Sequence, residues 1–103
     1  MFTNIITYTN NDSTWDSIED AHDAVRTIDA ETRTAAELQS LSALVSAGDL
    51  IVPASKVLSE DGTTFQFRSS ATQAGVDALA LFADASGKID TDITKTMTGW
   101  TED

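Results

Sequence analysis

A β-hairpin decides the fold that this sequence predicts, and it lies in the stretch Lys56-Val-Leu-Ser-Glu-Asp-Gly-Thr-Thr-Phe-Gln-Phe-Arg-Ser-Ser70. The dipeptide Asp61-Gly62 separates two segments that favour strands, and an Asp-Gly pair in that position is typical of a tight antiparallel turn. We therefore predict one strand over Leu50–Leu58 and another over Thr63–Ser69. Pro53 lacks an amide hydrogen, so the first of these strands should lie at an edge of its sheet.

The segment before the hairpin has the periodicity of an amphipathic helix. Apolar side chains and one histidine recur every three or four residues at Trp15, Ile18, His22, Val25 and Ile28. A second such stripe follows at Ala35, Leu38, Leu41, Leu44 and Val45. Ser13 or Asp16 can cap the first stripe, and Gly48 is placed to end the second in a left-handed conformation. Whether Ser13–Gly48 is one helix or two stays open at this point.

A shorter helix and a last strand follow the hairpin. Ser70 and Gln73 have the spacing of a capping box. The helix that they begin carries the apolar side chains Val76, Leu79, Ala80 and Ala83, with Phe82 alongside, and Gly87 should end it. Strand-forming residues return in Ile89–Trp100, as they do at the start of the chain in Phe2–Thr9.

This order of elements is that of a split βαβ unit, in which two strand-helix-strand crossovers are joined by a hairpin. Right-handed crossovers place both helical regions on one face of the sheet. Alternation along the third strand then puts Phe65 and Phe67 on one face and Arg68 on the other. The uncovered face is predicted to be amphipathic, too apolar to be left wet across its whole width.

The element order, the Asp61-Gly62 hairpin and a last strand ending in Trp100 together resemble the small dimeric ferredoxin-like proteins, or dimeric α+β barrels. The resemblance covers the chain from Phe2 to Trp100. It implies that residues 1–103 form a single ferredoxin-like α+β domain. It implies a four-stranded antiparallel sheet with helices on one face and a homodimer that packs two open sheet faces together. It also implies a small pocket between the sheet and the helices of each subunit. The long helical region Ser13–Gly48 departs from the family pattern.

The composition of the chain argues against some classes of binding partner. Seventeen Asp and Glu against six Lys and Arg give a formal net charge of −11, so the protein should repel nucleic acid and anionic membrane surfaces. The chain has no Cys and one His, and we predict neither a metal site nor a cofactor. The N-terminus lacks the features of a signal peptide, so we expect a soluble, cytoplasmic protein. Its acidic, Lys-poor composition suits a saline, marine setting.

The function that we predict is homodimerisation and the binding of a small apolar or aromatic molecule. The candidate ligand-binding residues are Tyr8, Trp15, His22, Phe67, Arg68 and Trp100. His22 and Asn4 are candidate catalytic residues, because some enzymes of the resembled family place such polar groups around an oxidisable substrate. His22 can equally be a packing residue at the core edge. Two alternatives therefore stay open, namely a cofactor-independent monooxygenase-like enzyme and an acidic interaction protein that masks a basic surface.

Overall fold

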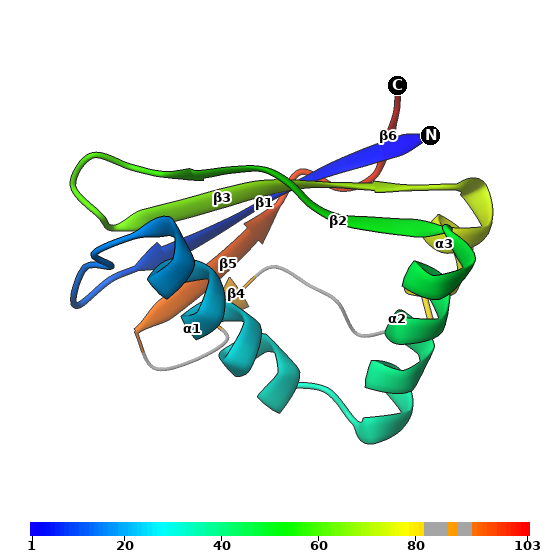
Figure 1. The fold of residues 1–103 in the computed structure, drawn as a ribbon, viewed down its shortest axis with the longest axis horizontal. Helices are drawn as coiled ribbons and strands as arrows, with labels where there is room; N and C mark the ends of the chain where they lie inside the picture. Colours follow the sequence, from blue (N-terminus) through cyan, green and yellow to red (C-terminus); the bar gives the residue numbers. More distant parts are fainter. Residues whose placement is uncertain (82–86, 89–91) are drawn as a thin grey trace.

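The computed structural model describes residues 1–81, 87–88 and 92–103, with the backbone alone at 52–54 and 87–88. This part of the chain forms an α+β fold with an open antiparallel sheet of six strands and three helices (Figure 1). The elements are β1 (Phe2–Asn10), α1 (Ile18–Glu31), α2 (Ala35–Ala47), β2 (Leu50–Leu58), β3 (Thr64–Ala71), α3 (Gln73–Leu79), β4 (Gly87–Lys88), β5 (Ile93–Met97) and β6 (Thr101–Glu102).

The strand order is β2-β3-β1-β5-β4, with β6 also beside β1, and each described pairing is antiparallel. The prediction that the Pro53 strand is an edge strand is confirmed, because β2 pairs only with β3 among the described strands. The order of β2, β3, β1 and β5 is compatible with the split βαβ arrangement. The predicted count of four strands is wrong, since the described sheet adds the two-residue strands β4 and β6.

The predicted hairpin between β2 and β3 is confirmed. The Ser59 amide donates to the Thr64 carbonyl oxygen at 2.9 Å, and the Gly62 amide donates to the Ser59 carbonyl oxygen at 3.0 Å. Gly62 has a φ of 75°, the left-handed backbone that glycine adopts most easily. The Asp61 carboxylate accepts hydrogen bonds from the Ser59 and Thr63 side chains and from the Thr63 amide. These bonds, that of Ser59 foremost, lower the pKa of Asp61.

The helical region before the hairpin is two helices. α1 ends at Glu31, and α2 begins after Thr34, whose side chain and that of Glu37 form a capping box. Gly48 ends α2 with a φ of 79°, as predicted. Both of the N-caps predicted for α1, Ser13 and Asp16, are wrong, because the side chain of Ser17 accepts from the Asp20 amide.

Hydrogen bonds to a neighbouring strand end and to the hairpin turn explain why α1 begins later in the sequence than predicted. Asn10 Oδ1 accepts from the amides of Asp12 and Ser13, which holds this segment in a turn. The Trp15 amide then donates to the carbonyl oxygen of Gly62 at 2.8 Å. The chain is therefore still tied to the hairpin at Trp15, and the helix can begin only beyond it.

The ends of α3 also differ from the prediction. Ser70 pairs with Thr3 within the β1–β3 ladder, so the cap is Thr72, whose Oγ1 accepts from the Gly75 amide at 3.1 Å. α3 ends at Leu79, well before Gly87, which lies in β4. The predicted apolar positions Phe82 and Ala83 lie outside the described residues.

The last strand is shorter than predicted. β5 covers Ile93–Met97, and residues 89–91 of the predicted strand lie outside the described residues. Beyond β5 the chain turns at Gly99, with a φ of 84°, and Asn4 Oδ1 accepts from the Gly99 amide at 3.1 Å. This turn separates β5 from β6, so Trp100 follows the strand instead of ending it.

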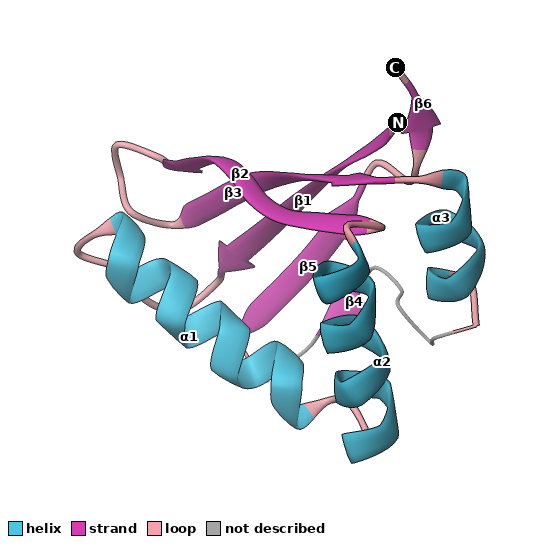
Figure 2. Cartoon of the chain, turned by 45° about the vertical axis from the view of Figure 1, so that its right-hand side comes forward, coloured by secondary structure: helices cyan, strands magenta, loops and turns pink. Residues whose placement is uncertain are grey.

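Helices α1 and α2 lie on the same side of the sheet (Figure 2). Two buried clusters lie between this side of the sheet and the helices. One contains Ile6, Tyr8, Ala21, Val25, Phe65 and Ile93, and the other contains Leu50, Ala71 and Leu79. The opposite side of the sheet, called the open face below, carries Thr3, Ile5, Thr7, Gln66, Arg68 and Thr96. The predicted alternation of Phe65 and Phe67 against Arg68 is thus confirmed.

Candidate functional site

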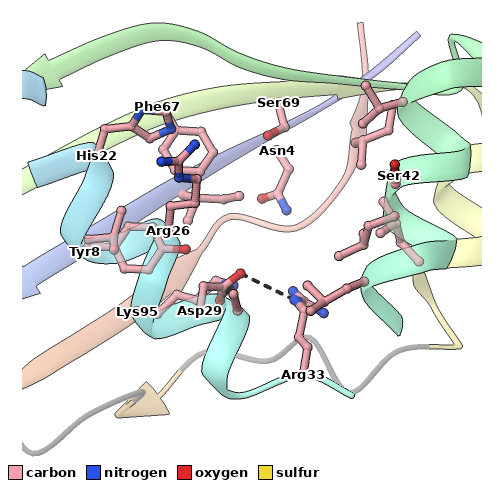
Figure 3. A pocket seen from close by; sticks show the side chains of 18 of the residues that line it. Asn4, Tyr8, His22, Arg26, Asp29, Arg33, Ser42, Phe67, Ser69 and Lys95 are labelled. Atoms are coloured by element: carbon pink, nitrogen blue, oxygen red, sulfur yellow. Dashed lines mark hydrogen bonds and ion pairs between the residues drawn. The ribbon is translucent and has the colours of Figure 1, made fainter. Parts of the chain in front are cut away.

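A cavity of about 440 Å³ lies between the helix-facing side of the sheet and the helices (Figure 3). Its walls are largely apolar. The sheet contributes Ile6, Tyr8 and Phe67, while α1 contributes Val25 and α2 contributes Leu41. Trp100, after the Gly99 turn, and Leu79 of α3 line it as well. The cavity therefore joins residues from both ends of the chain.

The cavity lies where only part of α2 packs on the sheet, through Leu41 and Leu44 against the cluster of Leu50 and Ala71. The turn between α1 and α2 lies away from the sheet, so the two helices diverge from it in a V (Figure 1). None of the α2 residues is fully buried, and Leu38 and Val45 remain 40% and 47% exposed although both line the cavity. These two side chains of α2 thus face a space that the described residues do not fill.

Two uncharged polar residues lie on the sheet side of the cavity. Asn4 on β1 and Ser69 on β3 are cross-strand partners, and they are 2% and 1% exposed. Asn4 Oδ1 accepts hydrogen bonds from the Gly99 amide and, at 3.4 Å, from Thr98 Oγ1. Ser69 Oγ has no hydrogen-bond partner among the described residues. Buried polar atoms without a partner are rare in native proteins, so this hydroxyl needs an explanation.

A charged group occupies another side of the cavity. Asp29 Oδ1 lies 3.0 Å from Lys95 Nζ, and Asp29 Oδ2 lies 3.4 Å from Arg33 Nε. The Lys95 side chain is 3% exposed and its Nζ lies 5.7 Å from the centre of the Tyr8 ring. With Arg26, these residues place three of the six Lys and Arg of the chain around one cavity. The Asp29–Lys95 ion pair also ties α1 to β5, which holds two walls of the cavity together.

His22 lies on α1 at the same cavity and beside the aromatic core. Its ring centre is 6.1 Å from that of Phe65. Partial burial, more than the nearby charges of Lys56 and Arg26, lowers the pKa of His22. The imidazole is therefore neutral at pH 7, a form in which one ring nitrogen can accept a hydrogen bond or a proton.

The cavity brings together most of the residues proposed from sequence. Tyr8, His22, Phe67 and Trp100 line it, and so does Asn4. Trp15 and Arg68 do not. Trp15 packs against the edge of the first core cluster, and Arg68 projects from the open face because it follows Phe67 on the same strand.

Sequence reasoning missed several polar residues of the cavity, although a signal for some of them was present. Ser69 shares its strand face with Phe65 and Phe67, and Lys95 shares its face with Ile93 and Met97. A polar or charged residue in an apolar alternation is a sign of a buried partner or a ligand. Asp29 carries the same sign, because it lies four residues after Val25 on the inner side of α1.

No family model, curated protein or solved structure matches this chain. Within the described ranges, no helix is long and apolar enough to cross a membrane. Among the described side chains, no group of three or more His, Asp or Glu residues is placed to hold a metal ion. The fold and the cavity therefore describe the protein by class, as an α+β protein with an open antiparallel sheet and a cavity under its helices.

Proposed function

We propose that this protein binds a small apolar or aromatic molecule in the cavity between its sheet and its helices. The observation that carries the proposal is a space of about 440 Å³ with mainly apolar walls. Cavities of about 300–1,000 Å³ with a few polar groups are typical of small-molecule sites.

The aromatic side chains of the cavity favour a flat ligand. The rings of Tyr8 and Phe67 are 6.1 Å apart and inclined by 23°, so they form one continuous surface on the sheet. Leu38 and Val45 of α2 line the same space and remain partly exposed. A ligand between these two surfaces would remove apolar area from water on both sides, which supplies the driving force for binding.

Val45→Trp tests this proposal by filling the cavity from its edge. Val45 lines the cavity but is 47% exposed, so a larger side chain can be accommodated without disrupting the core. We expect binding of the uncharged dye N-phenyl-1-naphthylamine, followed by its fluorescence, to weaken by about 10-fold or more. Loss of the burial of one aromatic ring costs about 1.5–3 kcal/mol, which corresponds to that change.

Ser46→Trp is the matched control, because Ser46 is the next residue of α2, is exposed and does not line the cavity. This variant should bind the dye like the original protein. Circular dichroism of both variants verifies that α2 still forms. Equal dye binding by the two variants, or no dye binding by the original protein, would contradict the proposal.

The finer architecture that we propose is a ferredoxin-like subunit that pairs its open face with a second copy, as in a dimeric α+β barrel. Three aliphatic side chains on this side, Ile5, Ile51 and Val57, are 37%, 51% and 55% exposed. Arg68 is the charged residue that β1, β3 and β5 place there within the described ranges. The Asp103 carboxylate, which accepts from Thr3 Oγ1, adds one negative charge at the end of this face. A face with so few charges in a chain of net charge −11 is a surface on which two copies can meet with little repulsion.

Light scattering tests the dimer. We expect a mass of twice 11.0 kDa, and stronger association at higher salt, since salt screens the repulsion between two chains of charge −11. Ile5→Lys should shift the protein toward the monomer, because it places two like charges in the interface. A mass of 11.0 kDa at every salt and protein concentration would contradict the dimer and leave the cavity proposal intact.

A cofactor-independent monooxygenase-like enzyme is the second candidate function. The observation that favours it is that His22, neutral at pH 7, and Asn4 line the same cavity. It requires one bound molecule to contact both side chains, which nuclear magnetic resonance of the labelled protein would report. The third hypothesis, an acidic protein that masks a basic surface, stays a prediction.

A further inference from the structure

We propose that Asn4 Nδ2 and Ser69 Oγ together bind one carbonyl oxygen of an uncharged, mainly apolar ligand. The inference rests on the proposed function, because it concerns the polar side of the same cavity. It states what chemical group the ligand must carry and which two atoms select it.

The direction of the Asn4 amide follows from its partner. The Gly99 backbone amide can only donate, and it does so to Asn4 Oδ1 at 3.1 Å. The oxygen of the side-chain amide is therefore fixed toward Gly99, which leaves the Nδ2 hydrogens directed away from it. Asn4 and Ser69 lie next to each other at the cavity (Figure 3). Asn4 thus presents a hydrogen-bond donor to the cavity.

Ser69 supplies the second donor. The residue lines the cavity, and its buried hydroxyl lacks a partner among the described residues. Asn4 and Ser69 are direct cross-strand partners, and such residues have Cβ atoms about 4.5–5.5 Å apart. Donors on two directly paired residues of one sheet face can be directed at the same acceptor atom. A carbonyl oxygen has two lone pairs, and it therefore satisfies both.

The same atoms argue against other oxygen groups. Asn4 and Ser69 are uncharged and almost completely buried, so a carboxylate bound there would lose its hydration for two neutral hydrogen bonds. A ligand hydroxyl leaves one hydrogen without an acceptor. That hydrogen is its own if Ser69 donates to it, or that of Ser69 if Ser69 Oγ accepts from it, because Asn4 Oδ1 is directed toward the Gly99 amide. An apolar ketone fits both the donors and the apolar walls.

Three small probes of similar size test this assignment: acetophenone, which has a carbonyl, ethylbenzene, which lacks it, and benzoate, which carries a charge. Nuclear magnetic resonance titrations give the dissociation constant of each. In Ser69→Ala we expect acetophenone to bind roughly 3- to 10-fold more weakly, as for the loss of one hydrogen bond. Ethylbenzene should bind both proteins alike, and benzoate should bind more weakly than acetophenone.

Ser70→Ala is the matched control, since Ser70 is the next residue of β3 and points to the open face. It should leave the affinity for acetophenone unchanged. Ser69→Cys, which keeps a side chain of similar size with a much weaker donor, repeats the test should Ser69→Ala fold poorly. In the original protein, the Asn4 side-chain amide protons should move downfield with acetophenone and not with ethylbenzene.

The outcomes separate the two proposals. Equal loss of acetophenone and ethylbenzene binding in the Ser69 variants, an unmoved Asn4 amide, or tighter binding of benzoate would overturn the carbonyl assignment while the apolar cavity site stands. Failure of both acetophenone and ethylbenzene to perturb any cavity residue would overturn the proposed function itself.

Discussion

Replacement of Phe65 by alanine is expected to lower the free energy of unfolding by about 3–5 kcal/mol. Phe65 is 0% exposed and belongs to the larger core cluster, with its ring centre 5.9 Å from that of Phe67 and 6.1 Å from that of His22. Removing the ring leaves a hole where β1, β3 and α1 meet. Because small domains are stable by only about 5–15 kcal/mol, urea denaturation should show a large shift of the midpoint.

Phe67→Ala is the control for this prediction. Phe67 lies two residues further along the same strand, is only half-buried and lines the cavity. Its loss enlarges a space that already exists, so we expect a smaller decrease in stability together with weaker dye binding. Equal losses of stability in the two variants would show that Phe67 is packed as tightly as Phe65, which would contradict the presence of a cavity beside Phe67.

Replacement of Gly62 by alanine is expected to cost about 2–4 kcal/mol of stability, as the sum of two effects. The first is backbone strain, because the φ of 75° is left-handed and costs a residue with a Cβ about 1–2 kcal/mol. The second is a close approach, because a Cβ on Gly62 would lie 2.7 Å from the carbonyl oxygen of Trp15. Such overpacking typically adds about 1–3 kcal/mol.

Gly48→Ala separates these two effects. Gly48 has nearly the same φ, 79°, but a Cβ there would meet no atom within 4 Å. This variant should therefore lose only the strain, about 1–2 kcal/mol. Thermal and urea denaturation of the two variants side by side provide the measurement. Similar losses would mean that the hairpin turn and the Trp15 segment are not held against each other.

Local rules predicted several elements well. β2 has the predicted bounds Leu50–Leu58, Gly48 has the predicted left-handed backbone, and Gly62 lies in the predicted hairpin turn. These features depend on neighbouring residues alone: alternation defines a strand, and glycine relieves a steric conflict within its own residue. For the same reason, periodicity placed His22 on the apolar stripe of the first helix, and it placed Phe67 on the same strand face as Phe65, before their surroundings were known.

The helix starts were harder to predict because hydroxyl and carboxylate residues crowd each of them. Ser13, Asp16 and Ser17 are all competent caps for α1, and Ser70 and Thr72 are both competent caps for α3. The choice depends on partners distant in sequence. Trp15 is bound to the hairpin turn, and Ser70 is held in the β1–β3 ladder. In each case the later residue becomes the cap.

The sequence by itself determined the order of the four longer strands, the hairpin, the edge position of β2 and the two faces of β3. These follow from steric and solvation preferences that act over a few residues. Only the tertiary structure decided that the turn between α1 and α2 lies away from the sheet, that Gly99 binds Asn4, and that Ser69 Oγ has no hydrogen-bond partner within the described part of the chain. The physical reason is that a cavity is a property of surfaces that fail to meet, and no single segment contains both surfaces.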